Sequence, residues 1–345
     1  MREAVIVISD LYLEPGELAA EDGQGLPALS FAGRFGERAH LGGGWRAWLA
    51  RWLGVPGLGR APVAAVAAAA LPGPNAGVTR WIATPVELVA GLTRVHLDRR
   101  GLVHLHEAEL AELTADFRRT FGASGLALEP LGDGHLLLAT PGIAAVAAEE
   151  PARCAGAVLD VPHGPAAAAL LRLRAEIEMW LHAEPLNAAR RARGAPPVTG
   201  LWLWGATGDV APLEALASET GAHAGARPAT AAFGADAFLA GLCRLTGTPL
   251  AALPADLGAV LASAAAPRLA LVASMGGRAP AAEPPGLAAA AAALERQLIA
   301  PALAALGRGT LARLTLLASD TRVTLTRHSG LKRWRRPRTG LAAFA

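Results

Sequence analysis

Short continuous apolar runs along the chain alternate with segments whose apolar residues recur at helical spacing. Ala4–Ser9 is a β-branched apolar run, and Arg268–Ala273 and Leu311–Ala318 have the same texture. Continuous runs of this length are typical of strands buried on both faces of a parallel sheet. Between them, Trp45–Leu53 and Ala235–Leu245 place apolar residues three and four positions apart, which predicts helices with one buried face. The pattern therefore predicts an α/β fold with a mostly parallel sheet flanked by helices.

One region departs from this pattern. Residues 81–149 carry several short strand candidates around a single amphipathic helix, Glu109–Phe121. Hairpin-like strands beside one helix are typical of a small α+β unit rather than of a parallel sheet. We therefore expect an inserted α+β subdomain at 81–149, and a main α/β domain made of residues 1–80 and 150–345.

The most informative stretch is Asp160–Gly205. An amphipathic run extends to Leu181, and Pro185 then breaks it because its ring fits only the first turn of a helix. Asn187–Arg193 predicts a short helix or turn that carries three arginines, and Val198–Trp204 predicts a strand.

Composition narrows the class of protein. The 345 residues are 52% hydrophobic with a mean hydropathy of +0.33, but much of this is alanine. No uninterrupted apolar run reaches the roughly 18 residues of a membrane span, and the first residues lack a signal-peptide pattern. We expect no membrane partner and a cytoplasmic location. Cys154 and Cys243 have no metal-like spacing, so buried free thiols are expected.

The net charge of +3 is small, and the bases are almost all arginine. A basic tail at Lys332–Arg338 surrounds Trp334, either as a solvated end or as a surface for an acidic partner. A nucleic-acid partner is not expected, because such proteins gather their bases with aromatic residues on one face.

Candidate catalytic residues stand at predicted strand ends. Asp10 follows the first strand, Asp320 follows a later one, and His328 comes eight residues beyond it. Acids and histidines at the carboxyl ends of strands can assemble a two-metal site for phosphoryl transfer, although Asp10 can equally cap a turn. Because such a site needs about five to seven ligands, three candidates predict no metal and no cofactor; Mn or Zn is the alternative.

A binding surface is predicted from the arginine helix and the strand after it. Arginine forks bind carboxylate or phosphate at two points, and tryptophan supplies a rigid apolar wall. The expected ligand is a small anion or a protein partner. Alternatively, the arginines tie helix ends to acidic loops and the tryptophans fill the core. The candidate residues are Asn187, Arg190, Arg191, Arg193, Trp202 and Trp204.

These segments resemble the RpfE-type regulatory proteins, a bacterial family associated with the control of pathogenicity factors. The resemblance is carried by Pro162, Gly164, Pro165, Glu176-Ile177, Leu181-His182, Pro185, Asn187, Ala189-Arg190, Ala192-Arg193-Gly194, Pro197-Val198 and Leu201–Gly205, with weaker matches at Thr84-Pro85-Val86 and Trp334–Pro337. It implies a regulatory role.

The chain is also similar, more distantly, to archaeal-type cofactor-independent phosphoglycerate mutases of the alkaline-phosphatase superfamily. Phe238–Gly247 and Asp10 carry this likeness, which implies an alkaline-phosphatase-like fold. Where the mutases have metal-binding Asp and His after a strand, this chain has Ser274-Met275-Gly276-Gly277, and where they have Asp-His it has Asp320-Thr321. The resemblance thus implies a mutase-like scaffold without metal-dependent catalysis; an active mutase or phosphatase is the alternative.

Overall fold

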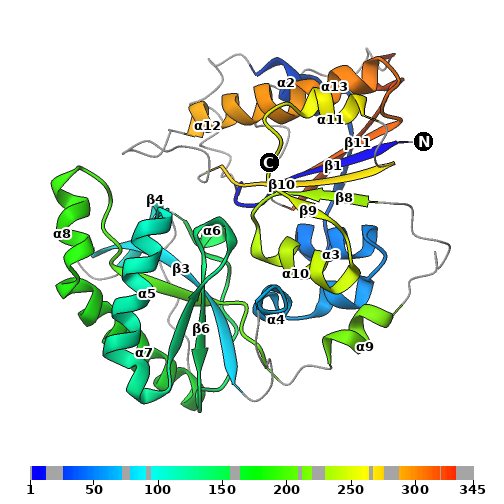
Figure 1. The fold of residues 1–345 in the computed structure, drawn as a ribbon. Coiled ribbons are helices and arrows are strands. Elements are labelled where there is room, and N and C mark those ends of the chain that lie inside the picture. The colour runs from blue at the N-terminus through cyan, green and yellow to red at the C-terminus, as the bar shows by residue number, and fades with distance from the viewer. Residues whose placement is uncertain are drawn as a thin grey trace. The chain divides into compact units, whose positions relative to one another are not determined.

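The computed structural model describes residues 2–12, 26–71, 78–90, 95–155, 164–208, 212–219, 230–263, 267–275, 287–318 and 320–331. The chain forms two compact units, each with its own sheet (Figure 1). Unit 1 consists of Met1–Arg60, Leu216–Ala279 and Pro284–Ala345, and unit 2 of Ala61–Ala215 with Pro280–Glu283. The basic tail at Lys332–Arg338 and Gly276-Gly277 lie outside the described residues.

The sheet of unit 1 has seven strands in the order β2-β12-β11-β1-β10-β8-β9. Five of them run parallel: β1 (Glu3–Ile8), β8 (Thr230–Phe233), β9 (Leu250–Ala251), β10 (Arg268–Ala273) and β11 (Arg313–Ala318). β12 (Thr321–Thr326) returns antiparallel to β11, and β2 (Glu37–His40) pairs antiparallel with β12. This mostly parallel sheet confirms the predicted fold class.

Helices cover both faces of this sheet (Figure 1). One face carries α2 (Pro27–Phe35), α11 (Leu257–Ala262), α12 (Leu287–Leu294) and α13 (Ala300–Gly307), whose apolar residues form one core with Ile6 and Leu271. The other carries α3 (Gly44–Trp52) and α10 (Ala237–Thr246), where Trp45 meets Phe238 edge-on at a ring distance of 6.1 Å. Short turns occur at η1 (Pro56–Arg60) and η5 (Ser329–Leu331), and α9 spans Leu213–Ser218.

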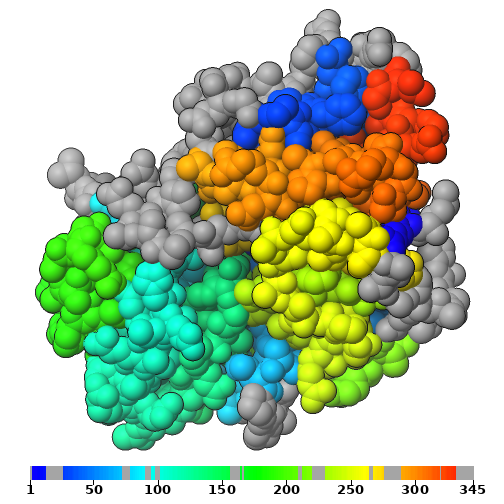
Figure 2. Space-filling view, turned by 45° about the horizontal axis from the view of Figure 1, so that its top comes forward, coloured from blue at the N-terminus to red at the C-terminus, as the bar shows by residue number. Residues whose placement is uncertain are grey.

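The long alanine-rich helix contains a π-helical turn, η4 (Glu295–Ile299), between α12 and α13. Pro301 comes just after this turn, inside the continuous helical run, and its missing N–H interrupts the hydrogen-bond ladder at the place where the helix is already π-helical. Glu295 is buried, and its two carboxylate oxygens accept from the N–H groups of Ala28 (3.0 Å) and Leu29 (3.1 Å). A carboxylate from this turn therefore caps the N-terminus of α2, whose surface adjoins that of α12 and α13 in Figure 2.

Unit 2 is built on an antiparallel sheet. Its strands are β3 (Thr79–Ala90), β4 (Val95–Leu102), β5 (Ala127–Pro130), β6 (Leu136–Thr140) and β7 (Gly200–Trp204), and β3 pairs with β4, β6 and β7. The helices are α4 (Val63–Ala68), α5 (Glu107–Phe121), α6 (Pro151–Cys154), α7 (Pro165–Ala183) and α8 (Pro185–Ala192), with short turns η2 (Gly122–Ser124) and η3 (Gly132–Gly134). One core joins α5 and α7 to the sheet, through residues such as Phe117, Ile177 and Leu203.

This unit extends beyond the insertion expected at 81–149. β7 pairs with β3 over Ile82–Val86, so the segment that carries α7, α8 and β7 belongs to the antiparallel sheet and not to the larger one. Composition did not reveal this because β7 is buried on both faces and reads like a strand of the parallel sheet.

One helical run, Ala289–Gly307, is long and apolar enough to cross a membrane by length and composition, and 50% of its apolar window is buried inside the protein.

Candidate functional site

The carboxyl edge of the large sheet brings Asp10 beside the end of β10. Ile8 of β1 lies opposite both Ala273 of β10 and Ala318 of β11, so the residues that follow these strands leave the sheet at one level. Asp10 is half-buried, and its Oδ1 accepts from the N–H of Met275 at 2.7 Å. The carboxylate of Asp10 therefore joins the ends of β1 and β10. This matches the alternative raised from the sequence, in which Asp10 caps a turn.

Asp320 is also at this edge, but His328 is not. Asp320 occupies the turn between β11 and β12, where Ala318 lies opposite Thr321. β12 then runs back across the sheet, and His328 follows its far end, where Thr326 lies opposite Arg313. At about 3.3 Å per residue, the six residues of β12 carry His328 to the opposite edge. The expected grouping of Asp10, Asp320 and His328 is therefore wrong, because the returning strand was read without its direction.

The described residues beside Asp10 offer few of the ligands that a two-metal site needs. Next to Asp10, β10 is followed by Ser274 and Met275, and the buried Ser274 offers at most a weak hydroxyl ligand. Within the described ranges, no group of three His, Cys, Asp or Glu side chains is placed to hold a metal ion.

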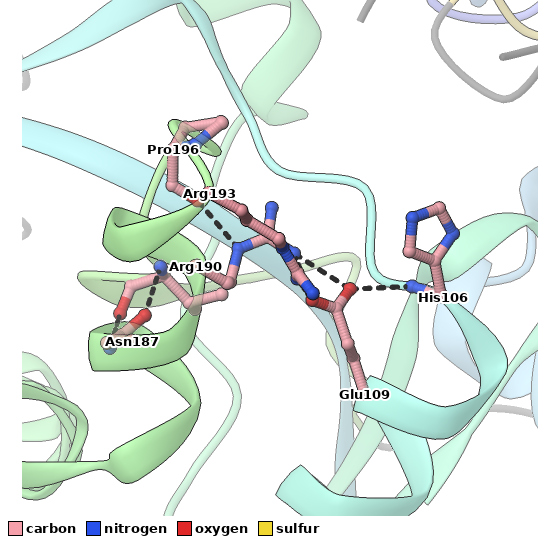
Figure 3. A network of polar contacts seen from close by, with 7 residues as sticks. His106, Glu109, Asn187, Arg190, Arg193 and Pro196 are labelled. Atoms are coloured by element: carbon pink, nitrogen blue, oxygen red, sulfur yellow. Dashed lines mark hydrogen bonds and ion pairs between the residues drawn. The ribbon is translucent and has the colours of Figure 1, made fainter. Parts of the chain in front are cut away.

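The predicted arginine surface is organised around an acid, Glu109 of α5 (Figure 3). Arg190 donates through one Nη1 to both Glu109 oxygens, at 2.7 and 2.8 Å, and through Nε to the carbonyl of Pro196 at 2.7 Å. Arg193 makes an ion pair with the same carboxylate, which also accepts the N–H of His106 at 2.9 Å. Arg190 and Glu109 are both buried, so this pair joins α8 to the start of α5 away from solvent.

Burial shifts the protonation equilibria around this pair. It lowers the pKa of Arg190, and Glu87 acts in the opposite direction. Burial also lowers the pKa of His104, helped by the charge of Arg190 and opposed by Asp133. His104 is therefore neutral at pH 7, and Glu109 remains the charge partner of both arginines.

Asn187 is a second internal tie. Its side-chain amide donates to the carbonyls of Leu181 and Val198, and its Oδ1 accepts the N–H of Val198, all at 2.7 Å. With an exposed fraction of 1%, Asn187 joins α7, α8 and the approach to β7. Arg191 and Arg193 are exposed, and Arg193 is already paired with Glu109. Of the four polar candidates, Arg191 is the one most open to solvent contact with a ligand.

Trp202 and Trp204 fill one face of β7. Both are buried, while Leu201 and Leu203 on the opposite face join the core with α5 and α7. The indole N–H of Trp202 donates to the carbonyl of Glu149, and that of Trp204 donates to Thr84 Oγ1, both at 2.9 Å. These contacts match the core-filling alternative, since both N–H groups are satisfied inside the chain.

A pair of carboxyl groups near this cluster was not predicted from the sequence. Glu184, buried between α7 and α8, shares a hydrogen bond with Asp116 of α5. Burial and then this neighbour raise the pKa of Glu184 to about 7. The bond from Glu184 and the N–H of Trp180 lower the pKa of Asp116, so the shared proton resides on Glu184. Neither this pair nor Glu109 has a sequence signal, because both are formed by side chains about 70 to 80 positions apart.

No family model matches this sequence, and no curated protein matches it. Among solved structures, the chain is similar to the cofactor-independent phosphoglycerate mutase from Thermoplasma acidophilum DSM 1728, with 15% identity, a TM-score of 0.38, and coverage of 94% of this chain and 89% of that one. It is also similar to the PH0037 protein from Pyrococcus horikoshii, with 12% identity, a TM-score of 0.45, and coverage of 94% and 87%.

Proposed function

We propose that this chain is a regulatory binding protein of the RpfE type on a phosphoglycerate-mutase-like scaffold, without metal-dependent catalysis. Its ligand is a small anion or a protein partner, and its location is the cytoplasm. The resemblance of Asp160–Gly205 to the regulatory family motivates the regulatory role.

One observation carries the proposal of a binding protein. Asp10, the acid that a metal site at this edge would need first, accepts the N–H of Met275 at 2.7 Å and thereby holds two strand ends together. The positions beside it offer Ser274 and Met275, and His328 lies at the other edge of the sheet. Since hard metal ions need several oxygen or imidazole ligands at once, this edge supports binding or structural roles better than two-metal phosphoryl transfer.

The test is a turnover assay of the full chain on phosphoglycerates and on an aryl phosphate, with Mn²⁺ or Zn²⁺ added. We expect no turnover above a reaction without protein. Turnover that disappears in Asp10→Asn but persists in Asp256→Asn would refute the proposal. Asp256 is a matched control, because its carboxylate also accepts a backbone N–H, from Ala259 at 3.1 Å.

An active metal-dependent mutase or phosphatase is the second candidate function. It is favoured by the position of Asp10 and Asp320, which follow adjacent parallel strands at the same edge. Calorimetric titration with Mn²⁺ separates the two candidates. Tight binding that Asp10→Asn and Asp320→Asn each abolish would favour the enzyme.

A further inference from the structure

A corner of unit 1 places a helix N-terminus at the carboxyl edge of the sheet. β2 runs parallel to β11, and its last residue, His40, lies opposite Thr321 at the start of β12. The chain then passes through Leu41, whose N–H donates to the carbonyl of Asp320 at 2.7 Å, and α3 begins at Gly44. The segment Leu41–Gly44 and the first turn of α3 thus lie beside the β11–β12 turn, at the edge where α/β sheets bind ligands.

Buried donors without acceptors gather in this corner. Trp45, in the first turn of α3, is 1% exposed, and its indole Nε1 has no hydrogen-bond partner among the described residues. Arg322, which lies opposite Ala39 of β2, has a buried Nε without a partner. Since a buried donor costs free energy when it is left unpaired, two such groups in one corner indicate an acceptor that the described residues do not supply.

The same corner holds further positive charge. The guanidinium of Arg46 lies 4.4 Å from the centroid of the Trp45 ring. Arg38 of β2 lies outside this corner, because it pairs with Val323, whose side chain joins the core on the face that carries α2. The acids on the segments that form the corner are Glu37 and Asp320.

The backbone adds donors of its own. The N–H of Gly44 donates to the carbonyl of Leu41 at 3.2 Å. The cap of α3 is Gly43, which has no side chain to accept from the N–H groups that follow, and no acid lies in the first turn of the helix. Uncapped N–H groups and the helix dipole favour an anion at this position. A Cβ on Gly42 would meet nothing within 4 Å, so the approach to the loop is open on that side.

We propose that this corner binds a phosphate group, held by Arg322, the indole N–H of Trp45 and the first N–H groups of α3. A phosphate fits because it offers several acceptor oxygens and no obligatory donor, which matches a corner of donors. The group comes from free inorganic phosphate or from a phosphate monoester. This inference rests on the proposed function in the case that the ligand is a small anion. It assigns a binding site to that anion.

The test is calorimetric titration of the full chain with inorganic phosphate and with phosphoglycerate, in a chloride buffer of fixed ionic strength. Arg322→Gln removes a guanidinium donor, and Trp45→Phe removes the N–H while it keeps a ring. Arg51→Gln is the control, because Arg51 is exposed in the last turn of the same helix. We expect Arg322→Gln to weaken binding about tenfold or more, Trp45→Phe to weaken it several-fold, and Arg51→Gln to leave it unchanged.

The outcomes separate this inference from the proposed function. If wild type, Arg322→Gln and Trp45→Phe bind phosphate with equal affinity, the proposed phosphate site is overturned. The proposal that the protein binds an anion then remains. If the wild type binds neither phosphate nor phosphoglycerate, the proposed phosphate site is overturned as well. The turnover assay tests the proposed function independently. If Arg322→Gln does not fold, Trp45→Phe and Arg322→Lys decide the question. Tighter binding of phosphoglycerate than of phosphate identifies a monoester site, and the reverse identifies a free-phosphate site.

Discussion

Two polar clusters of this protein use arginine in opposite ways. In unit 2, Arg190 is buried against Glu109, and its Nε and Nη1 both donate to acceptors of the chain. In unit 1, Arg322 and Trp45 keep buried nitrogen atoms for which the described residues offer no acceptor. The first cluster is complete as folded, whereas the second is completed by an acceptor from outside.

The difference shows how to separate structural arginines from ligand-binding ones. An arginine-rich helix near tryptophans looks like a binding surface in the sequence, but an acid 81 positions away from Arg190 neutralises it. The corner of unit 1 has less conspicuous residues, yet its donors remain unmatched. Unsatisfied burial therefore identifies a site better than a local concentration of charge.

The largest effect is expected when the cluster of Glu109 and Arg190 in unit 2 is disrupted. Glu109→Gln removes the charge partner of buried Arg190 and should lower the free energy of unfolding by about 3–5 kcal/mol, measured by urea denaturation. Arg193→Gln is the control: because Arg193 is exposed, its loss should cost about 1 kcal/mol or less. Equal losses in the two variants would mean that Glu109 does not act through Arg190.

The N-terminus of α2 is capped by a side chain of the protein, in contrast to the N-terminus of α3. Glu295 gives the N-terminus of α2 the carboxylate that α3 lacks. Glu295→Gln should lower the free energy of unfolding by about 2 kcal/mol, because two charge-assisted bonds to buried N–H groups are weakened. Added phosphate should not restore this loss, since the donors concerned are those of α2. Recovery in phosphate would contradict a separate role for the α3 corner.

The carboxyl pair of unit 2 should make stability depend on pH. Unfolded Glu184 loses its proton near its ordinary pKa, 4.5, whereas folded Glu184 holds it to about 7. The native state binds more protons between these values, so stability falls as pH rises from about 4.5 to about 7. Glu184→Gln should remove this fall, on the order of 2 kcal/mol; the lowered pKa of Asp116 acts below this pH range and does not offset it. Urea denaturation at pH 5 and pH 8 measures it, and an unchanged difference between the two pH values would disprove the shared proton.

The smallest effect concerns the loop before α3. Gly43 has a φ of +85°, a left-handed conformation that a side chain disfavours, so Gly43→Ala should cost about 1 kcal/mol or slightly more. Gly42→Ala is the matched control, because its Cβ would enter open space. Thermal unfolding of both variants checks this. If Gly42→Ala is the more destabilising of the two, the described loop is incorrect.

Much of the fold was predictable because it depends on local patterns. The runs at Ala4–Ser9 and Arg268–Ala273 identified buried strands, and the aromatic stripe of Trp45–Leu53 identified a helix. What could not be read was direction and pairing. His328 was grouped with Asp10 because nothing in the sequence shows that β12 returns across the sheet, and β7 was assigned to the larger sheet although it pairs with β3.

The site was harder to predict, since burial and partners arise from contacts distant in sequence. Arg190 and Asn187 carry the right chemistry for an anion, but their neighbours Glu109 and Val198 already use it. Trp45 was read as part of an apolar stripe, and its ring does lie in the core beside Phe238. Only the folded chain reveals that its N–H lacks an acceptor there.

The indole N–H signal of Trp45 tests the central claim most directly. In a ¹H–¹⁵N spectrum of the full chain, Trp45→Phe identifies this signal by its disappearance. We predict that phosphate, added at constant ionic strength against chloride, shifts the Trp45 signal downfield in a saturable way in the wild type and not in Arg322→Gln. A signal that stays in place at saturating phosphate would contradict the account.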